Sequence, residues 1–466
     1  MEWRKNSTFQ NPNYIQSPFS SPTNNRNQYY NANYSPISVI RNQPLLPPSF
    51  QDQAQINNDS QQNNEDFENQ RFSYYMSSFP LYCCDWTTIN EYDTECIALS
   101  SYKEGLNNKL HILHGLKYGK EATFEEDEDM INGSFENDNI EGFDFHKVSE
   151  IDIDYPVTNL QWDPMMSKYG LNERLATSSE VLRLYKVDHD SYDNNGDYQL
   201  VQTHYLTNNN SKAQKEMMTN PPVTSFDWNK VDNSIIITSS VDTTCTVWDL
   251  NRSISIDNQG HKVDSAAVKT QLIAHDSEVF DVKFLNDSTN LFASVGNDGS
   301  MRIFDLRSLE HSTIIYEPSN DVKIKSSNSS SYNSKALIKL DTSNIDQHYL
   351  ATIGVNSDQI IIIDTRMPGV PVSILDGSFD GLTNTAINSI KWHPSSNFLL
   401  SGGDDCQSLV WDCNNLFQNK NDSSMIINSP VMAYQDNLEI NNVCWRGGQG
   451  DWMGVVSGKG FQAVSI

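Results

Sequence analysis

Residues 291–305, which read LFASVGNDGSMRIFD, decide the fold of this 466-residue chain. Two short apolar runs flank an Asn-Asp-Gly turn. Asn or Asp followed by Gly between apolar runs is a strong hairpin signal. The stretch therefore predicts a β-hairpin.

The same pattern recurs at residues 235–249 and 398–412. Both copies close with Trp followed by Asp, at Trp248 and Trp411, and this dipeptide is the signature of propeller blades. In all three copies the turn aspartate lies six residues before the closing aromatic residue. Self-similarity of this kind indicates a repeat architecture.

A second repeated pattern marks the start of each blade. The segment PVTNLQW at 156–162 returns as PVTSFDW at 222–228, and looser copies bring the number to seven. The copies end at Trp86, Trp162, Trp228, Phe284, Leu340, Trp392 and Trp445. When five polar insertions are set aside, about 41 residues remain per blade, close to the usual repeat of about 40–45. We therefore predict an all-β, seven-bladed WD-repeat β-propeller over residues 71–466.

Two kinds of segment fall outside this repeat. Residues 1–70 hold 24 Asn or Gln residues, which predicts a disordered N-terminal tail because such a segment cannot bury enough apolar surface to offset its ordering entropy. The long inter-strand insertions are expected at 117–147, 188–219, 251–267, 318–334 and 415–429. The insertion at 117–147 is strongly acidic, and we interpret it as a solvated loop, with docking as the alternative.

The last predicted blade lacks room for a fourth strand, since the chain ends within the strand 461–466. The segment 71–76 precedes the first blade and has no blade of its own. We expect it to supply the missing outer strand, which would close the ring and protect its sheet edges.

The turn aspartates predict a polar network inside individual blades. Each Asp is expected to reach a hydroxyl on the preceding strand, with a histidine at the start of the blade where one is present, because buried polar groups need partners. The residues assigned to these networks are His275, Ser294 and Asp298, then Thr238, Asp242 and Trp248, and finally Ser401, Asp405 and Trp411. We interpret these groups as structural and not catalytic.

Composition excludes several function classes. The net charge of −28 argues against direct binding to nucleic acid or to an anionic membrane surface, which needs basic patches. Apolar runs such as 360–363 are far shorter than the roughly 18 residues of a membrane span, and the N-terminus does not resemble a secretory signal. The seven cysteines form no CxxC pair, so we expect buried, reduced thiols instead of a zinc or disulfide site.

Enzyme motifs are missing from the sequence. It contains no P-loop, GxGxxG, HExxH or GxSxG pattern, so we predict no enzyme activity and no cofactor. His111 and His114 form an HxxH pair in an apparent strand, but the sequence offers no evident third ligand. We interpret the pair as a surface feature, with a metal site as the alternative.

Seven segments resemble one group of WD-repeat proteins: PVTSFDWN (222–229), SVDTTCTVW (240–248), VKTQLIAHD (268–276), FASVG (292–296), FDLR (304–307), LEHSTIIYE (309–317) and EINNV (439–443). The chain is similar over about 71–466 to the family of plant Transparent Testa Glabra and anthocyanin-regulating proteins, which includes an animal cullin-four-associated factor. The resemblance implies an adaptor without chemistry. Plant members hold bHLH and MYB transcription factors together, and the animal member scaffolds protein kinases and is linked to a cullin ubiquitin ligase.

Three functions remain open at this point: a protein-interaction scaffold, a substrate receptor of a cullin-RING ubiquitin ligase, and, least favoured, an enzyme. For the scaffold, strand starts on one face of the ring are expected to bind kinases or transcription regulators, since loops carried by a rigid framework commonly do so. The candidate partner face comprises Tyr155, Pro222, Thr224, Asp276, Glu278, Thr385 and Asn441.

For the ligase receptor, the candidate adaptor-binding boxes comprise Asp305, Arg307, Asp364 and Arg366, although Asp and Arg are also ordinary at such strand ends. We expect a monomeric propeller found in cytoplasm and nucleus. Four serines precede proline and are candidate phosphorylation sites: Ser17, Ser21, Ser35 and Ser429.

Overall fold

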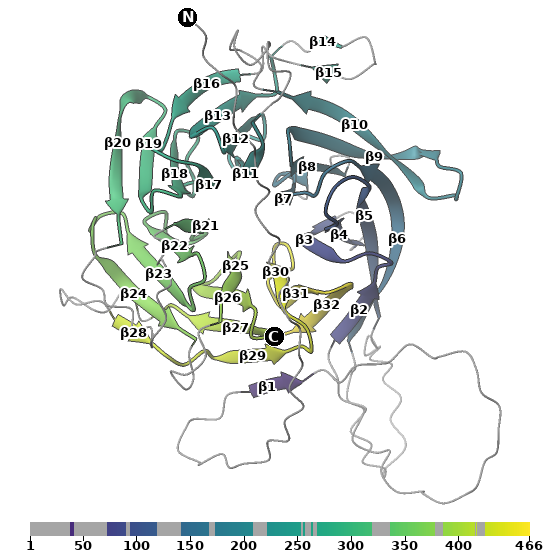
Figure 1. The fold of residues 1–466 in the computed structure, drawn as a ribbon. Coiled ribbons are helices and arrows are strands. Elements are labelled where there is room, and N and C mark those ends of the chain that lie inside the picture. The colour runs from purple at the N-terminus through teal and green to yellow at the C-terminus, as the bar shows by residue number, and fades with distance from the viewer. Residues whose placement is uncertain are drawn as a thin grey trace, which may run out of the picture. The chain divides into compact units, whose positions relative to one another are not determined.

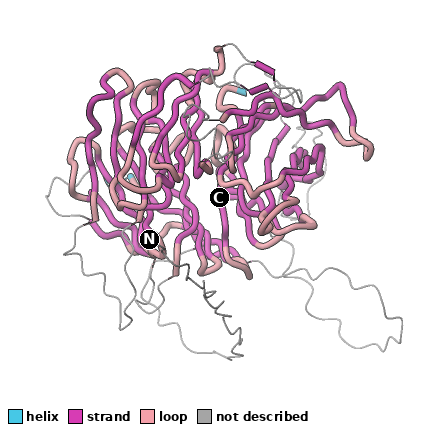
Figure 2. Tube along the Cα trace, turned by 45° about the horizontal axis from the view of Figure 1, so that its top comes forward, coloured by secondary structure: helices cyan, strands magenta, loops and turns pink. Residues whose placement is uncertain are grey.

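Seven β-sheets are arranged around a central axis in the computed structural model (Figure 1). The described residues are nearly all strands and turns, as Figure 2 shows, and none of them forms an apolar helix of membrane-spanning length. The structure describes residues 38–41, 72–89, 94–118, 141–166, 173–207, 221–252, 255–256, 262–263, 268–318, 336–377, 385–414, 416 and 425–466. The predicted seven-bladed β-propeller is therefore confirmed, with the blades taken in chain order from residue 81.

Each blade has four antiparallel strands, which follow one another outward from the axis. The inner strands are β3 (Leu81–Ile89), β7 (Asn159–Trp162), β11 (Val223–Trp228), β17 (Val279–Phe284), β21 (Leu337–Thr342), β25 (Ile387–Trp392) and β30 (Ile440–Trp445). The second strands are β4 (Thr94–Ser101), β8 (Arg174–Ser178), β12 (Ile235–Ser240), β18 (Leu291–Gly296), β22 (Tyr349–Gly354), β26 (Phe398–Gly403) and β31 (Trp452–Ser457).

The outer half of each blade is more solvated than the inner half. The third strands are β5 (Asn108–Tyr118), β9 (Leu182–Tyr192), β13 (Thr244–Asp249), β19 (Met301–Asp305), β23 (Gln359–Asp364), β27 (Gln407–Asp412) and β32 (Gly460–Ser465). The outer strands are β6 (Gly142–Ile153), β10 (Tyr198–Leu206), β16 (Val268–Ile273), β20 (Ser308–Tyr316), β24 (Pro371–Asp376), β29 (Met432–Gln435) and β2 (Phe72–Met76). Every residue of β12 is buried, whereas the first seven residues of β20 are exposed. Second strands are covered by the neighbouring blades on both faces, so they consist of continuous apolar and small residues.

The ring is closed by the segment that precedes the first blade. Strand β2 pairs antiparallel with β32 from Phe72 opposite Val464 to Met76 opposite Gly460, so the two lie side by side in Figure 1. The expected outer strand of the seventh blade is thus confirmed. Because β2 then continues into β3, the last blade is joined covalently to the first.

A buried ion pair fastens the same seam. Arg446, which follows β30, donates from Nη2 to Glu95 Oε1 at 2.6 Å, and Glu95 is fully buried at the edge of β4. Glu95 Oε2 also accepts hydrogen bonds from Trp86 Nε1 at 2.7 Å and Thr88 Oγ1 at 2.9 Å. The buried charge is therefore both paired and hydrogen-bonded, as burial requires.

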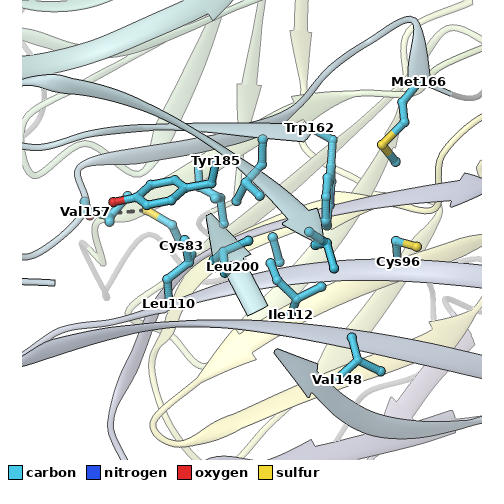
Figure 3. Packing of buried hydrophobic residues seen from close by; sticks show 14 residues of the cluster. Cys83, Cys96, Leu110, Ile112, Val148, Val157, Trp162, Met166, Tyr185 and Leu200 are labelled. Atoms are coloured by element: carbon cyan, nitrogen blue, oxygen red, sulfur yellow. Dashed lines mark hydrogen bonds between the residues drawn. The ribbon is translucent and has the colours of Figure 1, made fainter. Parts of the chain in front are cut away.

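Apolar side chains fill the seams between blades. At the seam of the first and second blades, Leu110 and Ile112 of β5 pack with Trp162 of β7 and Tyr185 of β9 (Figure 3). Similar clusters occupy the other seams, for example Phe226, Trp228 and Trp248 beside the second blade. The aromatic anchors quoted from the sequence lie in these clusters, with one correction. In the fifth blade Thr342, and not Leu340, holds the register position that Phe284 holds in the fourth.

Several predicted insertions contain strands. The inter-strand insertion predicted over 188–219 includes part of the blade itself at 188–206, because β9 and β10 pair across this range with Asp188 opposite Gln199. Strands β14 (Ser255–Ile256) and β15 (Lys262–Val263) extend the second blade, and β28 (Met425–Ile427) extends the fifth. These segments form strands because they pair with a neighbouring strand, although their polar composition favours a loop.

Other predictions fall mostly on segments that the structure does not describe. The acidic insertion is placed between β5 and β6, with residues 119–140 outside the described ranges. The predicted disordered tail also lies outside them, except for β1 (Ser38–Arg41), whose backbone pairs parallel with β29 of the sixth blade.

Candidate protein-interaction site

A ring of seven side chains surrounds the mouth of the central channel. Near its start, the inner strand of six blades carries a β-bulge, where the pairing register shifts by a residue. A bulge re-aims the side chain that it contains. The ring is formed by Tyr82, Thr158, Thr224, Phe280, Ile338, Asn388 and Asn441, which with Lys339 and Asp404 line a cavity of about 440 Å³. We call this set the mouth ring.

The polar members of the mouth ring join neighbouring blades. Thr158 Oγ1 donates to Val223 O at 3.0 Å, and Thr224 Oγ1 donates to Val279 O at 2.5 Å. In the same way, Asn388 Nδ2 donates to Ile440 O at 3.0 Å, and Asn441 Nδ2 donates to Leu81 O at 3.0 Å. In each pair the acceptor belongs to the inner strand of the next blade. These four side chains therefore stabilise the ring itself.

The remaining members of the mouth ring are apolar or aromatic. Phe280 and Ile338 come from the adjacent fourth and fifth blades, and both are only half-buried. Tyr82 comes from the first blade, and its ring lies 5.5 Å from that of Tyr102 between centroids. Partly exposed apolar side chains around an opening are typical of binding sites, since they gain stability when a ligand covers them.

A second set of inter-blade hydrogen bonds lies deeper in the channel. A side-chain oxygen on one inner strand accepts a hydrogen bond from a backbone N–H of the next. The pairs are Asp85 with Trp162 (2.8 Å), Gln161 with Trp228 (3.1 Å), Asp227 with Phe284 (2.9 Å), Asp281 with Leu340 (2.9 Å), Asp341 with Trp392 (2.6 Å) and Ser389 with Val443 (3.4 Å). The channel residues are thus used to hold blades together.

Charge in this part of the channel is balanced. Lys283, Lys339 and Lys391 line the same cavity of about 50 Å³ as Asp85, Asp281 and Asp341. Burial lowers the pKa of Lys283, but Asp227, Asp281 and Asp341 outweigh it, so the net pKa is raised and the ammonium is retained. Burial raises the pKa of Asp85, although Lys391 and the Trp162 N–H oppose that shift.

The structure places two of the seven residues of the predicted partner face in the mouth ring. Thr224 and Asn441 belong to the mouth ring, where both already bond to the next blade. Tyr155, Pro222 and Asp276 are exposed in loops before inner strands. The remaining two residues of the predicted partner face are Glu278 and Thr385. Glu278 accepts a hydrogen bond from Asn297 at 2.9 Å, and Thr385 lines a separate small cavity.

Sequence reasoning missed five members of the mouth ring, among them its three apolar or aromatic residues, Tyr82, Phe280 and Ile338. A bulge breaks the period of two, so the faces to which these residues point cannot be read from alternation. One signal was available, because each residue directly follows the first apolar residue of an inner strand.

The structure brings one predicted blade network together completely. In the fourth blade, His275 Nδ1 lies 3.0 Å from Asp298 Oδ1, and His275 Nε2 lies 2.7 Å from Ser294 Oγ. Burial lowers the pKa of His275, against the effect of Asp298. Burial raises the pKa of Asp298, but hydrogen bonds from Ser300 and His275 outweigh it and lower the pKa. The buried side chains of His275 and Ser294 are thereby hydrogen-bonded, and Asp298 is held at the turn.

The third and sixth blades contain only part of that network. Trp248 Nε1 donates to Thr238 Oγ1, and Trp411 Nε1 donates to Ser401 Oγ, both at 3.0 Å. Their turn aspartates bond locally instead: Asp242 Oδ1 accepts from Thr244 N at 3.2 Å, and Asp405 Oδ1 accepts from Gln407 N at 3.1 Å. The expected reach of Asp242 and Asp405 to the preceding strand is therefore wrong, since neither blade has a histidine to bridge the gap.

The two candidate ligase boxes have the same geometry. Arg307 donates from Nη2 to Asp305 Oδ2 at 2.7 Å, and Arg366 donates from Nη2 to Asp364 Oδ2 at 2.7 Å. Hydrogen bonds from Arg307 hold the pKa of Asp305 at about 2. Both arginines remain exposed at the ends of β19 and β23, and the Arg366 guanidinium lies 5.5 Å from the centre of the Tyr349 ring. Among the Ser-Pro serines, Ser429 is exposed, and the other three lie outside the described residues.

The interpretation of His111 and His114 as a surface pair is wrong. His111 is buried, and its Nε2 lies 3.3 Å from Glu150 Oε2. His114 points to the other side of the strand, where its Nε2 lies 3.0 Å from Glu173 Oε1. The two residues are three positions apart on β5, which places their side chains on opposite sides of the strand, and Glu173 of the second blade packs against His114.

Comparisons with known proteins agree with this architecture. The family model "WD domain, G-beta repeat" matches residues 214–249, 267–305 and 369–412. The WD repeat-containing protein YPL247C of Saccharomyces cerevisiae is 38% identical over 84% of this chain and 76% of its own length. A WD repeat-containing protein of Schizosaccharomyces pombe, C17D11.08, is 36% identical over 73% of this chain and 69% of its own. The DDB1- and CUL4-associated factor 7 homolog of Dictyostelium discoideum is 32% identical over 86% of this chain and 100% of its own.

A rigid ring with a half-apolar mouth, whose polar groups are committed to joining blades, defines a platform for binding other proteins. The chain belongs to the WD-repeat family, whose propellers are generally non-enzymatic scaffolds. It functions as a protein-interaction adaptor.

Proposed function

We propose that this adaptor holds protein kinases or transcription regulators through the mouth ring. The observation that supports the proposal is that the polar and the apolar members of that ring have different contacts. Four polar side chains fasten the blades, and this leaves Phe280, Ile338 and Tyr82 to contact a partner. The partner classes come from the resemblance to the plant and animal adaptors described above, which is part of the proposal.

An extended peptide segment is the partner shape that fits best. The opening of about 440 Å³ is within the usual range of ligand pockets, and Lys339 lines both this opening and the smaller cavity of the channel. Aromatic and aliphatic anchors at the centre of an interface commonly supply most of the binding energy. Partners are expected to insert one or two apolar side chains between Phe280 and Ile338.

The test is affinity purification of the full chain followed by mass spectrometry. The combined substitution Phe280→Ala and Ile338→Asp is expected to remove kinases and transcription regulators from the bound fraction. Ile314→Asp is the matched control, because Ile314 is also apolar and lies 46% exposed on the outer strand of the fourth blade. Unchanged recovery with the double substitution, or an absence of both partner classes from the wild-type fraction, would count against the proposal.

A second candidate function is that of a substrate receptor of a cullin-RING ubiquitin ligase. It is supported by the matching arginine–aspartate pairs in adjacent blades and by the name of the Dictyostelium relative. Replacing Arg307 and Arg366 with alanine is expected to abolish co-purification with the ligase adaptor. Arg252→Ala is the control, since Arg252 has a similar but longer pair with Asp249 at 3.5 Å in the third blade. Retained binding after the double replacement would exclude the boxes.

This proposal places the protein in both cytoplasm and nucleus, where the two partner classes act. Imaging of a fluorescent fusion in growing cells tests that expectation directly. Signal confined to one compartment would restrict the partners to those found there.

A further inference from the structure

Metal-ligating side chains converge between the first and second blades, away from the mouth ring. Cys96 on β4 lies directly opposite His114 on β5 in the sheet register. Glu173 comes from the second blade, immediately before β8. One ligand atom from each of these three residues lies within 4.8 Å of those of the other two.

A second histidine approaches the same carboxylate. His189 on β9 places Nε2 at 3.3 Å from Glu173 Oε1, the oxygen that lies 3.0 Å from His114 Nε2. Two ligand atoms bound tetrahedrally to zinc at about 2.0–2.3 Å are roughly 3.3–3.7 Å apart. The two contacts of Glu173 Oε1 with the histidines are therefore close to the spacing of a metal-bound pair, and His189 approaches the group of three through Glu173 alone.

Burying the Glu173 carboxylate without a further partner is unfavourable in free energy. Glu173 is 2% exposed, and its Oε2 is buried with no hydrogen-bond partner among the described residues. An unpaired buried carboxylate oxygen is strongly unfavourable, and native proteins satisfy such groups or coordinate a metal with them. Cys96 is fully buried at the end of the apolar cluster in Figure 3, with its sulfur directed away from Ile112.

We propose that Cys96, His114, Glu173 and His189 form a Zn²⁺ site that joins the first blade to the second. A thiolate, two imidazoles and a carboxylate complete the four-coordinate set that zinc prefers, whereas Mg²⁺ and Ca²⁺ select oxygen ligands. Four protein ligands leave no open position, so the site is structural. The competing arrangement is a metal-free one in which Glu173 only accepts hydrogen bonds from the two histidines, and Cys96 then has no part in it.

The experiment uses the full chain, stripped with a chelator and then titrated with Zn²⁺ or Co²⁺. Metal content after desalting is measured by mass spectrometry, and the near-ultraviolet absorption of the Co²⁺ form reports thiolate coordination. Cys245→Ala is the control for Cys96→Ala, since Cys245 is equally buried in the third blade. Wild type and Cys245→Ala are expected to hold about one zinc per chain. Cys96→Ala and Glu173→Gln are expected to bind at least about 10-fold more weakly, with no thiolate band.

Zinc is also expected to raise the Tm of the wild type but not that of Cys96→Ala, because a ligand that binds only the folded state stabilises it. Should the buried variants fail to fold, His189→Ala carries the test, since His189 is 42% exposed. It is expected to weaken zinc binding at least about 10-fold, while His311→Ala on the exposed strand β20 leaves binding unchanged. The proposal is overturned if the wild type takes up no zinc, or if the ligand variants bind it as tightly as their controls.

Discussion

The fourth and seventh blades have the same strand order but are held together differently. The fourth is continuous in sequence, and a turn at residues 306–307 joins its outer strand β20 to β19. The seventh is assembled from both parts of the chain, and its outer strand β2 is attached to β32 by backbone pairing. In the fourth blade the polar network is internal, from His275 to Asp298 and Ser294. In the seventh blade Arg446 reaches across to Glu95 of the first. A blade built locally can be stabilised locally, whereas a blade built from distant segments depends on its neighbours.

The largest effect is expected from removal of residues 1–76, which deletes β2. The edge of β32 would then present unpaired backbone groups, and the covalent link between the last and first blades would be lost. Differential scanning calorimetry should show a large fall in Tm. A chain that begins at residue 71 keeps β2 and serves as the control. An unchanged Tm after deletion to residue 76 would show that the strand does not stabilise the ring.

The next largest loss of stability is expected from Arg446→Met, because the buried Glu95 carboxylate then has no cationic partner. Breaking a buried ion pair in this way typically costs about 3–5 kcal/mol in the free energy of unfolding. Urea denaturation measures the loss, and the added substitution Glu95→Gln is expected to recover part of it. Arg307→Met removes an exposed ion pair in the fourth blade and should change little. Equal effects of the two methionine variants would contradict the contrast between the blades.

His275→Gln tests the internal network, with an expected loss of roughly 1–3 kcal/mol from the unpaired Asp298 and Ser294 groups. The network also predicts a pH dependence. The folded pKa of His275 is below its unfolded value, so the unfolded state binds more protons, and stability falls as pH drops below about 6.5. The lowered pKa of Asp298 acts in the same direction below about pH 4.

His111 and His393 also have lowered pKa values, so the comparison must be made between variants. The free energy of unfolding of wild type and His275→Gln should converge as pH falls from 7 to 5. A constant difference over that range would show that His275 does not titrate with folding.

The smallest effect is expected from Ser401→Ala in the sixth blade, which has the tryptophan bond but no histidine. Losing the acceptor of Trp411 Nε1 should cost about 1 kcal/mol. Thermal denaturation of Ser401→Ala and of Ser294→Ala compares the loss of stability in the sixth blade with that in the fourth. A larger loss in the sixth blade would mean that the histidine network adds nothing to the simpler bond.

The local sequence pattern was sufficient to predict the fold and the polar network of the fourth blade. The hairpins at 235–249, 291–305 and 398–412 lie where predicted, because each has two apolar runs around a turn aspartate, and the Asn-Asp-Gly turn of 291–305 specifies a hairpin by short-range sterics. The His275 network also followed from spacing within one blade. The mouth ring could not be predicted in the same way, since Phe280 and Ile338 lie at bulges that interrupt the alternation.

The sequence by itself determined the number of blades, the outer strand β2 and the acidic character of the chain. Each of these depends on repetition, on a missing strand or on composition, which are properties of the chain taken in order. The tertiary structure alone decided which residues meet across seams, such as Arg446 with Glu95, and His114 with Glu173. Those contacts join segments of different blades. Ring closure and packing decide which residues become partners, and a local pattern in the chain does not predict either of them.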